Sequence, residues 1–405
     1  MVQVIIVVNN IIDPFQRICG VPIIIRLLRE IYTAGIKDVV IVGEAQARKL
    51  SILIQQGAKI GLSITNKLDD ISSDLTIIIP SNIVLDEMLI RQLLKSDPGT
   101  FFVVERNNEI AVVAGLIGKR DIGRVFDIIT NRNLDNLKGF KIINIDDLVV
   151  YYPRLRRKLK VLAVPIMDKK DIKKASRTIV SRTQKGLHIT SEINRIFENA
   201  LTYALCRFTW VTPNRITILA NILGFLTAFL FLTQKPILAI IVAFITAIID
   251  GVDGKMARVR GIGTRLGEIE HSFDMLYEQV IYISWIYFVY TVYNDLTFLF
   301  LGFIFILSDT FTRHVYMQFK MSTGKNMLLM SKLDRFIAKI DGRRNVWFFY
   351  MLIGIIIEPV IGLYLMLIHS IITSIVYAIR AMQHLSKMDR NEGTKEWLEL
   401  VYKDI

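Results

Sequence analysis

The chain has 405 residues, of which 52% are hydrophobic and 21% charged, and its formal net charge is +13. This length favours two or more domains, and the hydrophobic content exceeds that of an average soluble domain, which indicates a membrane part. The positive charge suits either a nucleic-acid binder or a membrane protein whose cytoplasmic loops face anionic lipid, so its location along the chain decides between them.

Residues 1–165 are predicted to form an α/β domain. Short apolar runs rich in β-branched residues, at 2–8, 39–42 and 75–79, have the length of buried strands, and amphipathic stretches such as 22–34 separate them. Strands that alternate with helices predict a doubly wound, mainly parallel sheet. The first run has no basic segment before it, so we interpret it as a strand and not a signal peptide.

The two cysteines, Cys19 and Cys206, are far apart in the sequence and lack the spacing of metal ligands. They imply neither a disulfide framework nor a thiolate metal site, and we interpret them as packing residues.

Residues 166–210 are predicted to be a basic linker followed by an amphipathic helix. Lysines and arginines are dense from 154 to 185, which is typical either of a solvated linker or of a segment lying on lipid headgroups. Residues 190–207 carry apolar side chains at helical spacing, and we expect that helix to lie in the membrane interface.

Residues 211–385 contain six apolar segments that we predict to cross a membrane, and residues 386–405 form a tail. The segments are 216–232, 236–257, 272–293, 296–319, 346–360 and 361–382, with Glu358–Pro359 as the turn between the last two. The loops 254–271 and 320–344 and the tail are rich in lysine and arginine, whereas the alternate loops contain only Lys235. By the positive-inside rule this predicts a multi-pass protein of the cell membrane with both termini in the cytoplasm.

Carboxylates cluster where a membrane helix normally has none. Asp250 and Asp253 are three residues apart at the end of the second segment, and His271, Asp274 and Glu278 share one helical face at the start of the third. Buried carboxylates are costly unless cations offset them, and oxygen ligands suit Mg²⁺ or Mn²⁺, so four acids on two adjacent helices predict one or two divalent ions that clamp a phosphoryl group. The alternative is that the acids pair with Lys255, Arg258 and Arg265.

The second segment also resembles a family signature. Asp250, Asp253, Gly254, Ala257, Arg258 and Gly267 match the first part of the CDP-alcohol phosphotransferase signature, in which two further aspartates follow. Strict spacing places His271 and Met275 at those last two positions. A shift of three residues places Asp274 and Glu278 there, and we prefer that register because Met275 cannot bind a hard cation.

The resemblance implies roles for these residues. Asp250, Asp253 and Asp274, with Glu278, would bind the metal ions, and Glu278 would also take the proton of the acceptor hydroxyl, with His271 as the competing base. The CDP donor would contact Asp250, Gly254, Ala257, Arg258 and Gly267. Arg343 and Arg344 would bind a phosphate of the acceptor or simply anchor the helix at the headgroups. A homodimer is a further expectation from the family.

Residues 20–44 resemble the segment after the phosphate loop of sugar nucleotidyltransferases. Together with the rear half, this is similar to archaeal two-domain proteins in which inositol-phosphate cytidylyltransferase is fused to di-inositol-phosphate-phosphate synthase. The catalytic parts are missing here: no glycine precedes Gly20, Val21 stands at the expected lysine, and residues 80–82 replace the metal-binding aspartate, although Asp86 lies nearby. We therefore expect an inactive front domain.

The resulting prediction is an enzyme that transfers a phosphoalcohol from a CDP-alcohol to a second alcohol and releases CMP. Its partners would be the donor, the acceptor and membrane lipid, not nucleic acid. An ion-coupled transporter also carries intramembrane acids, and a membrane-tethered protein with a decayed site would explain the altered signature.

Overall fold

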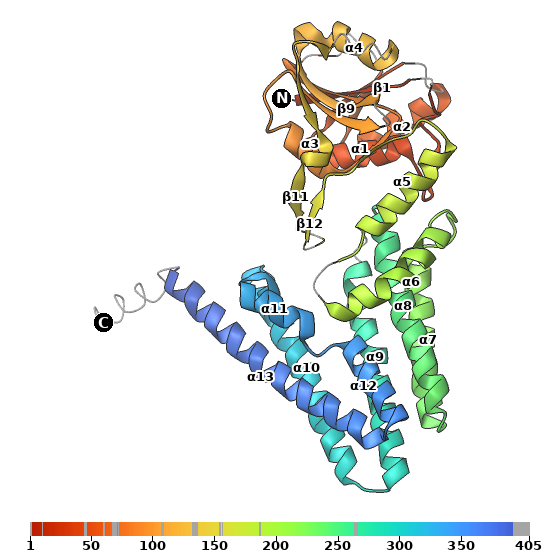
Figure 1. Ribbon diagram of the computed structural model, residues 1–405, viewed down its shortest axis with the longest axis vertical. Helices are drawn as coiled ribbons and strands as arrows, with labels where there is room; N and C mark the ends of the chain where they lie inside the picture. The colour runs from red at the N-terminus through yellow and green to blue at the C-terminus, as the bar shows by residue number, and fades with distance from the viewer. Residues whose placement is uncertain are drawn as a thin grey trace, which may run out of the picture. The chain divides into compact units, whose positions relative to one another are not determined.

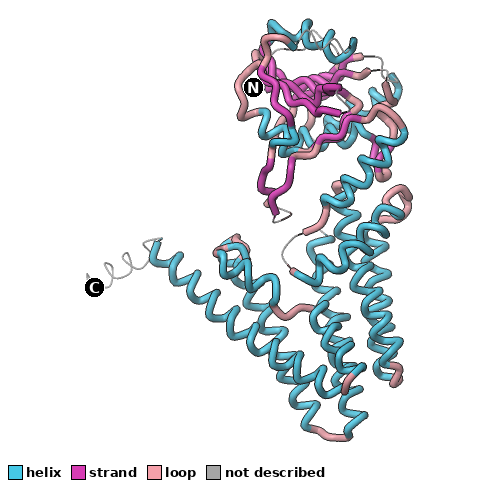
Figure 2. Tube along the Cα trace, viewed as in Figure 1, coloured by secondary structure: helices cyan, strands magenta, loops and turns pink. Residues whose placement is uncertain are grey.

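The computed structural model describes residues 2–9, 11–43, 47–59, 61–66, 71, 73–106, 109–131, 137–153, 155, 157–185, 188–262 and 266–391. These residues divide into two compact units (Figure 1). The first contains residues 1–185 with 203–209, and the second contains residues 186–202 with 210–405. In the described residues the strands lie in the first unit, and the second is helical (Figure 2).

A seven-stranded sheet forms the centre of the first unit, in the order β10-β8-β9-β6-β1-β4-β5. Its pairs β6–β1, β1–β4, β4–β5 and β10–β8 are parallel, and only β9 runs antiparallel to its neighbours β6 and β8. The strands are β1 (Val2–Val7), β4 (Asp38–Val42), β5 (Ser63–Thr65), β6 (Leu75–Pro80), β8 (Thr100–Arg106), β9 (Glu109–Gly118) and β10 (Lys141–Asn144). The predicted α/β fold and the three predicted strands are confirmed.

Helices cover both faces of this sheet, which explains why its central strands are apolar throughout. On one face α4 (Ile122–Asn131) packs Val125 and Ile128 against Ile5 and Ile78. The helices α1 (Ile23–Thr33) and α3 (Glu87–Leu93) lie on the other face (Figure 1), and α2 (Ala47–Lys59) precedes β5. The remaining elements are β2 (Arg17–Ile18), β3 (Val21–Pro22), β7 (Ile83–Leu85), β11 (Val149–Tyr152), β12 (Arg157–Lys160), β13 (Ala163–Pro165) and α5 (Lys169–Arg182).

The second unit has six long helices at the predicted positions. They are α7 (Pro213–Leu232), α8 (Pro236–Arg260), α9 (Leu266–Tyr293), α10 (Thr297–Thr323), α12 (Arg344–Ile356) and α13 (Pro359–Asn391). The turn at Glu358–Pro359 is confirmed. Among the described residues, four helices are long and apolar enough to cross a membrane: α7, α8, α10 and α13. The helix α9 carries acids and several tyrosines, and α12 has only 13 residues, so a count of six spans stays a prediction.

Small residues let these helices approach one another closely. A Cβ on Gly224 of α7 would lie 2.4 Å from the Tyr277 ring of α9, and one on Gly302 of α10 would lie 2.3 Å from Ile286. Close backbone approach of this kind is how helices pack when lipid surrounds them, because no hydrophobic force drives them together. It brings α8 and α9 into one bundle with α7.

Two further helices of the second unit bury their polar faces and expose their apolar ones. In α6 (Ile189–Leu205), Asn194 and Glu198 are buried, whereas Ile196 and Phe197 are 69% and 59% exposed. In α11 (Lys332–Ile340), Asp334 is buried against Arg380 and His384 of α13, and Phe336 is 57% exposed.

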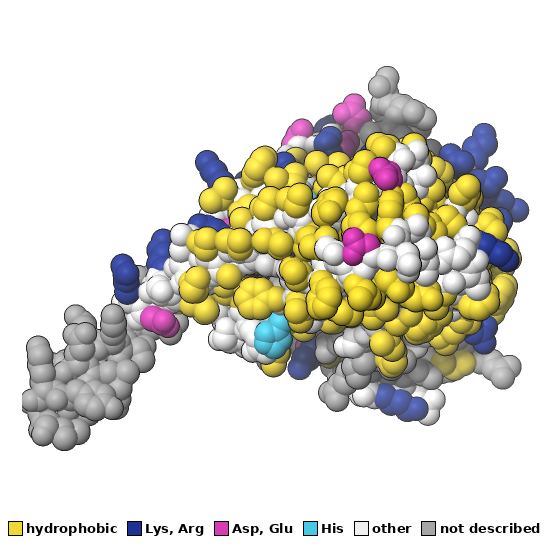
Figure 3. All heavy atoms as spheres, turned by 90° about the horizontal axis from the view of Figure 1, so that it is seen from below, with side chains coloured by type: hydrophobic (Ala, Val, Ile, Leu, Met, Phe, Trp, Pro, Cys, Tyr) yellow, Lys and Arg dark blue, Asp and Glu magenta, His cyan; other side chains and the backbone are white. Residues whose placement is uncertain are grey.

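This pattern is the reverse of a helix in water. It confirms the predicted amphipathic helix after the linker and adds a second one that the sequence analysis had assigned to a basic loop. The underside of the molecule in Figure 3 is likewise dominated by hydrophobic side chains, with lysines and arginines toward its edges.

Candidate active site

The helix α8 carries the first two signature acids on its last turns. The helix begins with Pro236 at its first turn and ends at Gly261, whose left-handed conformation (φ 64°) terminates it. Asp253 is 3% exposed, and its carboxylate accepts hydrogen bonds from the Thr217 hydroxyl of α7 (2.7 Å) and from the Gly254 N–H. Thr217 therefore links the start of α7 to the signature.

The helix α9 places Asp274 and Glu278 one turn apart, and both are buried. Between them, the Tyr277 hydroxyl lies 3.3 Å from Asp250 Oδ1. The close approach at Gly224 leaves room for this tyrosine, because a side chain there would occupy the position of its ring. Tyr277 thus connects α9 to Asp250 of α8, and a shared site of all four acids stays a prediction.

Arg344, at the start of α12, joins the two helices. Its guanidinium donates to Asp250 Oδ2 at 2.6 Å and lies 3.2 Å from Glu278 Oε1, and it also contacts the Tyr277 hydroxyl. The arginine predicted to bind an acceptor phosphate therefore does lie at the acids. It is bonded here to carboxylates, which compete with phosphate oxygens for the same planar donor set.

A second arginine holds Glu278 from the opposite side. Arg313 of α10 donates to Glu278 Oε2 at 2.7 Å and to Asp309 at 2.8 Å. Asp309 is 3% exposed and also accepts from Gln279 and from the Trp347 ring nitrogen, each at 3.0 Å. Charges therefore alternate along a partly buried chain, Asp309, Arg313, Glu278, Arg344 and Asp250.

The neighbouring signature residues lie on the same two helices. The nearest side-chain atom to the position of a Cβ on Gly254 is a guanidinium nitrogen of Arg258, at 3.1 Å, and Ala257 is partly buried on α8. Gly267 and His271 belong to α9, but the side chain of His271 lies outside the described residues. Whether His271 faces Glu278 stays a prediction.

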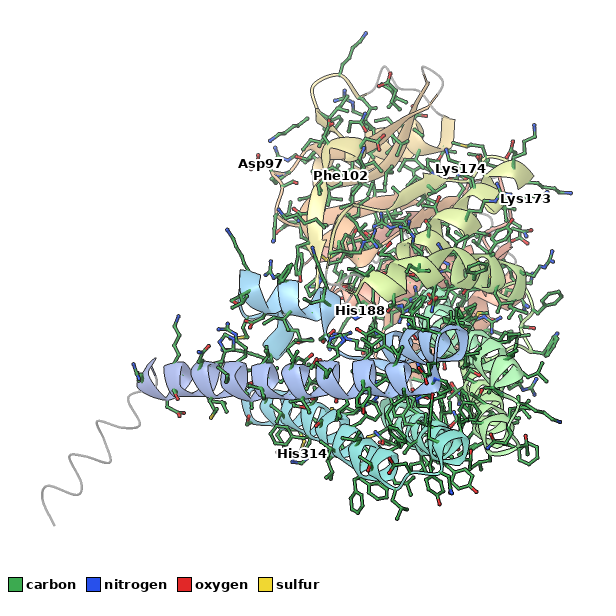
Figure 4. All side chains as sticks on the ribbon, turned by 60° about the horizontal axis from the view of Figure 1, so that its bottom comes forward. Asp97, Phe102, Lys173, Lys174, His188 and His314 are labelled. Atoms are coloured by element: carbon green, nitrogen blue, oxygen red, sulfur yellow. The ribbon has the colours of Figure 1, made fainter. Side chains whose placement is uncertain are left out.

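Arg343 lies at a different cluster from Arg344. Its guanidinium makes two hydrogen bonds to Asp341, at 2.6 and 2.7 Å, and Asp341 also contacts the Tyr377 hydroxyl. The ring nitrogen of His188, a residue labelled in Figure 4, lies 3.1 Å from the Asp341 carbonyl oxygen. Burial lowers the pKa of this histidine. Arg343 thus holds the turn before α12, and its predicted contact with an acceptor phosphate stays untested.

A buried ion pair attaches α6 to α8 inside the signature. The Lys255 ammonium is 1% exposed and lies 3.0 Å from Glu198 and 2.6 Å from the Asn199 side-chain oxygen. A Cβ on Gly251 would lie 2.5 Å from the Glu198 carboxylate, so only glycine allows this approach. Lys255 therefore pairs with an acid of α6, not with the signature acids.

The donor chemistry of the acids suits a hard divalent cation, because Asp250, Asp253, Asp274 and Glu278 offer only oxygen ligands. In the arrangement shown, no three His, Cys, Asp or Glu side chains of the described residues are grouped so as to hold a metal ion. Asp250 and Glu278 face arginines instead.

In the first unit, Asp86, the acid that follows residues 80–82 in the sequence, has a structural role. Asp86 caps α3 and accepts hydrogen bonds from Tyr152, Leu162 and Arg182. Burial raises the pKa of Asp86, and these donors oppose that shift. At the ends of β1 and β6, Asn9 donates to Asn82 at 2.8 Å, so these two amides bond to each other.

Sequence reasoning missed several residues of the site. Arg313, Gln279 and Trp347 each bond to the chain of charges, and Thr217 and Tyr277 bond directly to the signature acids. One signal was present: Arg313 follows Asp309 by four residues, the spacing of an ion pair along one helical face. The partners on other helices had no such signal.

Comparison with known proteins gives the following matches. Residues 210–379 match the family model described as CDP-alcohol phosphatidyltransferase. A stretch of 100 residues is 30% identical to the bifunctional IPC transferase and DIPP synthase of Thermococcus kodakarensis. The stretch covers 24% of this chain and 22% of that protein, so the chain aligns with about a fifth of the relative's length.

Among solved structures, phosphatidylinositol phosphate synthase of Mycobacterium tuberculosis with bound CDP-DAG is 19% identical, with a TM-score of 0.36 over 45% of this chain and 92% of that one. A putative glucose-1-phosphate thymidylyltransferase from Bacillus anthracis in complex with sucrose is 12% identical, with a TM-score of 0.33 over 44% and 95%.

Proposed function

We propose that this membrane protein transfers a phosphoalcohol group from a CDP-alcohol to a second alcohol, because residues 210–379 match the family model described as CDP-alcohol phosphatidyltransferase. The observation that carries the proposal is the junction of α8, α9 and α12, where Arg344 bridges Asp250 and Glu278. At this junction Asp250 of the signature and Glu278 of the shifted register share one partner, the Arg344 guanidinium, which is a group suited to binding phosphate.

The reaction requires a nucleophile, a base and charge stabilisation. The acceptor hydroxyl oxygen forms a bond to the donor phosphorus next to the transferred alcohol, the bond from that phosphorus to the oxygen of CMP breaks, and CMP leaves. Glu278 lies among the acids as the candidate to take the hydroxyl proton, and Arg344 and Arg313 orient its carboxylate. Arg344 also offers donors to phosphate oxygens of either substrate.

We propose that Asp250, Asp253, Asp274 and Glu278 hold Mg²⁺ or Mn²⁺, with two ions as the expected number. Such ions would neutralise the charge that develops on the transferring phosphate. Arg344, which bonds to Asp250 beside these acids, would contribute donors to the substrate phosphate. The acids Asp274 and Asp253 are buried at the same helices, consistent with a shared site.

The location follows from the apolar helices. Four helices suited to crossing a membrane and two helices with exposed apolar faces support a multi-pass protein. We propose that the signature end of α8 and both termini face the cytoplasm, because the basic loops lie on that side. The homodimer expected from the family is a proposal without a contact to support it.

The experiment is CMP release by the full-length protein purified in detergent, with Mg²⁺ or Mn²⁺ and with CDP-inositol, CDP-glycerol or a CDP-diether lipid, each offered to a panel of alcohols. We expect CMP with one donor–acceptor pair, only when metal is present. Asp250→Asn should abolish release, and Asp295→Asn, in the turn before α10, should retain it.

Release by Asp250→Asn at the full rate would refute the assigned site. No release from any pair by the folded wild-type protein would favour a membrane-tethered binding protein with a decayed site, in which Arg344 and Arg313 permanently neutralise the acids.

A further inference from the structure

The two cysteines, which are 187 residues apart in the sequence, meet in the first unit. The sulfur atoms of Cys206 and Cys19 lie 2.7 Å apart, closer than two unbonded sulfurs normally approach. Both cysteines are in the thiol form and buried, with 4% of Cys19 and 2% of Cys206 exposed. Residues 203–209 belong to the first unit, so the contact lies within that unit.

The backbone at Cys19 is unusual for a cysteine. Cys19 and Gly20 form the turn between β2 and β3 and have positive φ angles of 50° and 79°. Two successive left-handed residues are the mark of a tight hairpin turn that favours asparagine and glycine. A cysteine in this conformation carries backbone strain, which persists where the surroundings hold the residue in place.

A buried guanidinium lies beside the pair. Arg26 of α1 is 4% exposed and donates to the Ile18 carbonyl, one residue before Cys19, at 3.0 Å. Burial lowers the pKa of Arg26 to about 10, while the two nearby thiols act to raise it. A positive charge next to a thiol favours the thiolate, which is the reactive form of cysteine.

We propose that Cys19 and Cys206 form a site of reversible disulfide formation, which cross-links the β2–β3 turn to the segment directly before the family domain at residue 210. The reaction partner is a low-molecular-weight disulfide. A cysteine thiolate attacks one of its sulfurs and releases one thiol. The second cysteine then attacks the mixed disulfide and releases the other, so two protein thiols are oxidised and one small disulfide is reduced to two thiols.

The pair differs from packing cysteines in one respect that can be measured. Buried cysteines that only pack are inert, whereas a matched pair loses both thiols in one step, because the second attack is intramolecular. The site is separate from the acids of α8 and α9, so the inference does not depend on the proposed transferase function.

The test uses the reduced full-length protein in detergent, equilibrated with a series of ratios of oxidised to reduced glutathione, then acid-quenched, denatured and alkylated with N-ethylmaleimide. We expect both thiols to disappear together, an intact mass lower by two hydrogens before alkylation, and one linked peptide pair containing Cys19 and Cys206 in a non-reducing digest. The wild-type protein alone decides this result, so it does not depend on a variant that folds.

Cys19→Ser and Cys206→Ser are the matched controls, and each should retain one thiol that forms no intramolecular bond. The inference would be overturned if both thiols of the native protein stayed free at every ratio. It would also be overturned if oxidation yielded only glutathione adducts or disulfides between chains.

Discussion

At the scale of single residues, Glu278 is held between two arginines in a buried site. Arg313 and Arg344 each bond to one of its oxygens, and Asp309 orients Arg313 from the far side. Removing one partner from such a chain leaves an uncompensated buried charge, which is more costly than loss of the pair as a whole. Glu278 therefore depends on residues that the family signature does not include.

Arg313→Gln should lower the rate of CMP release about 10- to 100-fold, the usual effect of removing a group that orients a ligand or base. The reason is that the Glu278 carboxylate loses the donor from α10 that fixes its Oε2 atom. Steady-state kinetics of the purified variant measure this change. Arg335→Gln, an exposed arginine of α11, serves as the control and should retain the wild-type rate; equal losses in both variants would show that Arg313 has no special role.

The two candidate bases can be separated by substitution. Glu278→Gln should lower kcat by about 10²- to 10⁴-fold, the range that a positioned base contributes, whereas His271→Gln should have a smaller effect. The measurement is kcat for CMP release in each variant, with metal binding determined separately. A larger loss in His271→Gln would transfer the role of base to the histidine and leave Glu278 as a metal ligand.

At the scale of elements, two short helices lie with their polar sides against the long ones. The Glu198–Lys255 pair attaches α6 to α8, and the Asp334–Arg380 pair attaches α11 to α13. Burial raises the pKa of Glu198, and Lys255 opposes that shift. Bonds to Arg380, Ser331 and His384 lower the pKa of Asp334 despite its burial. The apolar sides of both helices are left for lipid.

Glu198→Ala should destabilise the helical unit by about 3–5 kcal/mol, because it leaves the Lys255 charge buried and unpaired. Adding Lys255→Met to the same chain should recover most of that loss. Unfolding of the single and double variants in mixed micelles measures the coupling. Independent, additive effects would contradict a direct pair between α6 and α8.

Phe336 of α11 should contact acyl chains. We expect a tryptophan in Phe336→Trp to be quenched by brominated lipids in proteoliposomes, because this side chain is 57% exposed on the apolar face. The signal is the difference from the wild-type protein. In Lys339→Trp, on the basic side of α11, aqueous iodide should quench the new tryptophan more strongly than brominated lipids do. If the same quencher were the stronger one at both positions, α11 would not lie in the membrane interface.

At the scale of the whole molecule, the chain combines a sheet unit with a helical unit that carries the candidate site. The first unit keeps the strand order and covering helices of an α/β fold, but its polar groups bond to one another at the ends of β1 and β6. Asp86 likewise accepts hydrogen bonds from other groups of the protein, the Leu162 N–H and the Arg182 guanidinium. That this unit is an inactive docking or regulatory module stays a prediction from the sequence.

The full-length protein should release no pyrophosphate from CTP, UTP or dTTP with inositol phosphate or glucose 1-phosphate in the presence of Mg²⁺. The physical reason is that no glycine precedes Gly20 in the sequence to form a phosphate-binding loop, and that the Asp86 carboxylate accepts hydrogen bonds from Tyr152 and other groups of the protein. A coupled pyrophosphate assay measures this, with an active nucleotidyltransferase added as the positive control. Turnover above the background of a no-enzyme sample would restore a function to the first unit.

The sequence by itself determined the elements and the signature acids. Periodicity and apolar length placed the strands of the first unit and the six long helices, because those signals are local to a few turns of chain. The spacing of Asp250, Asp253, Asp274 and Glu278 likewise predicted which acids share a helical face. The turn at Pro359 was visible because proline cannot continue a preceding helix but fits the first turn of the next one.

Only the tertiary structure decided which distant residues meet. Arg313 and Arg344 reach Glu278 from two other helices, Lys255 pairs with Glu198 of α6, and Cys19 meets Cys206. The sequence also did not indicate that the polar side of α11 faces the protein. A short basic stretch is typical of a loop, and the bond from Arg380 to Asp334 is visible only in the structure. Contacts between helices depend on rotation and depth of packing, which no local pattern of residues encodes.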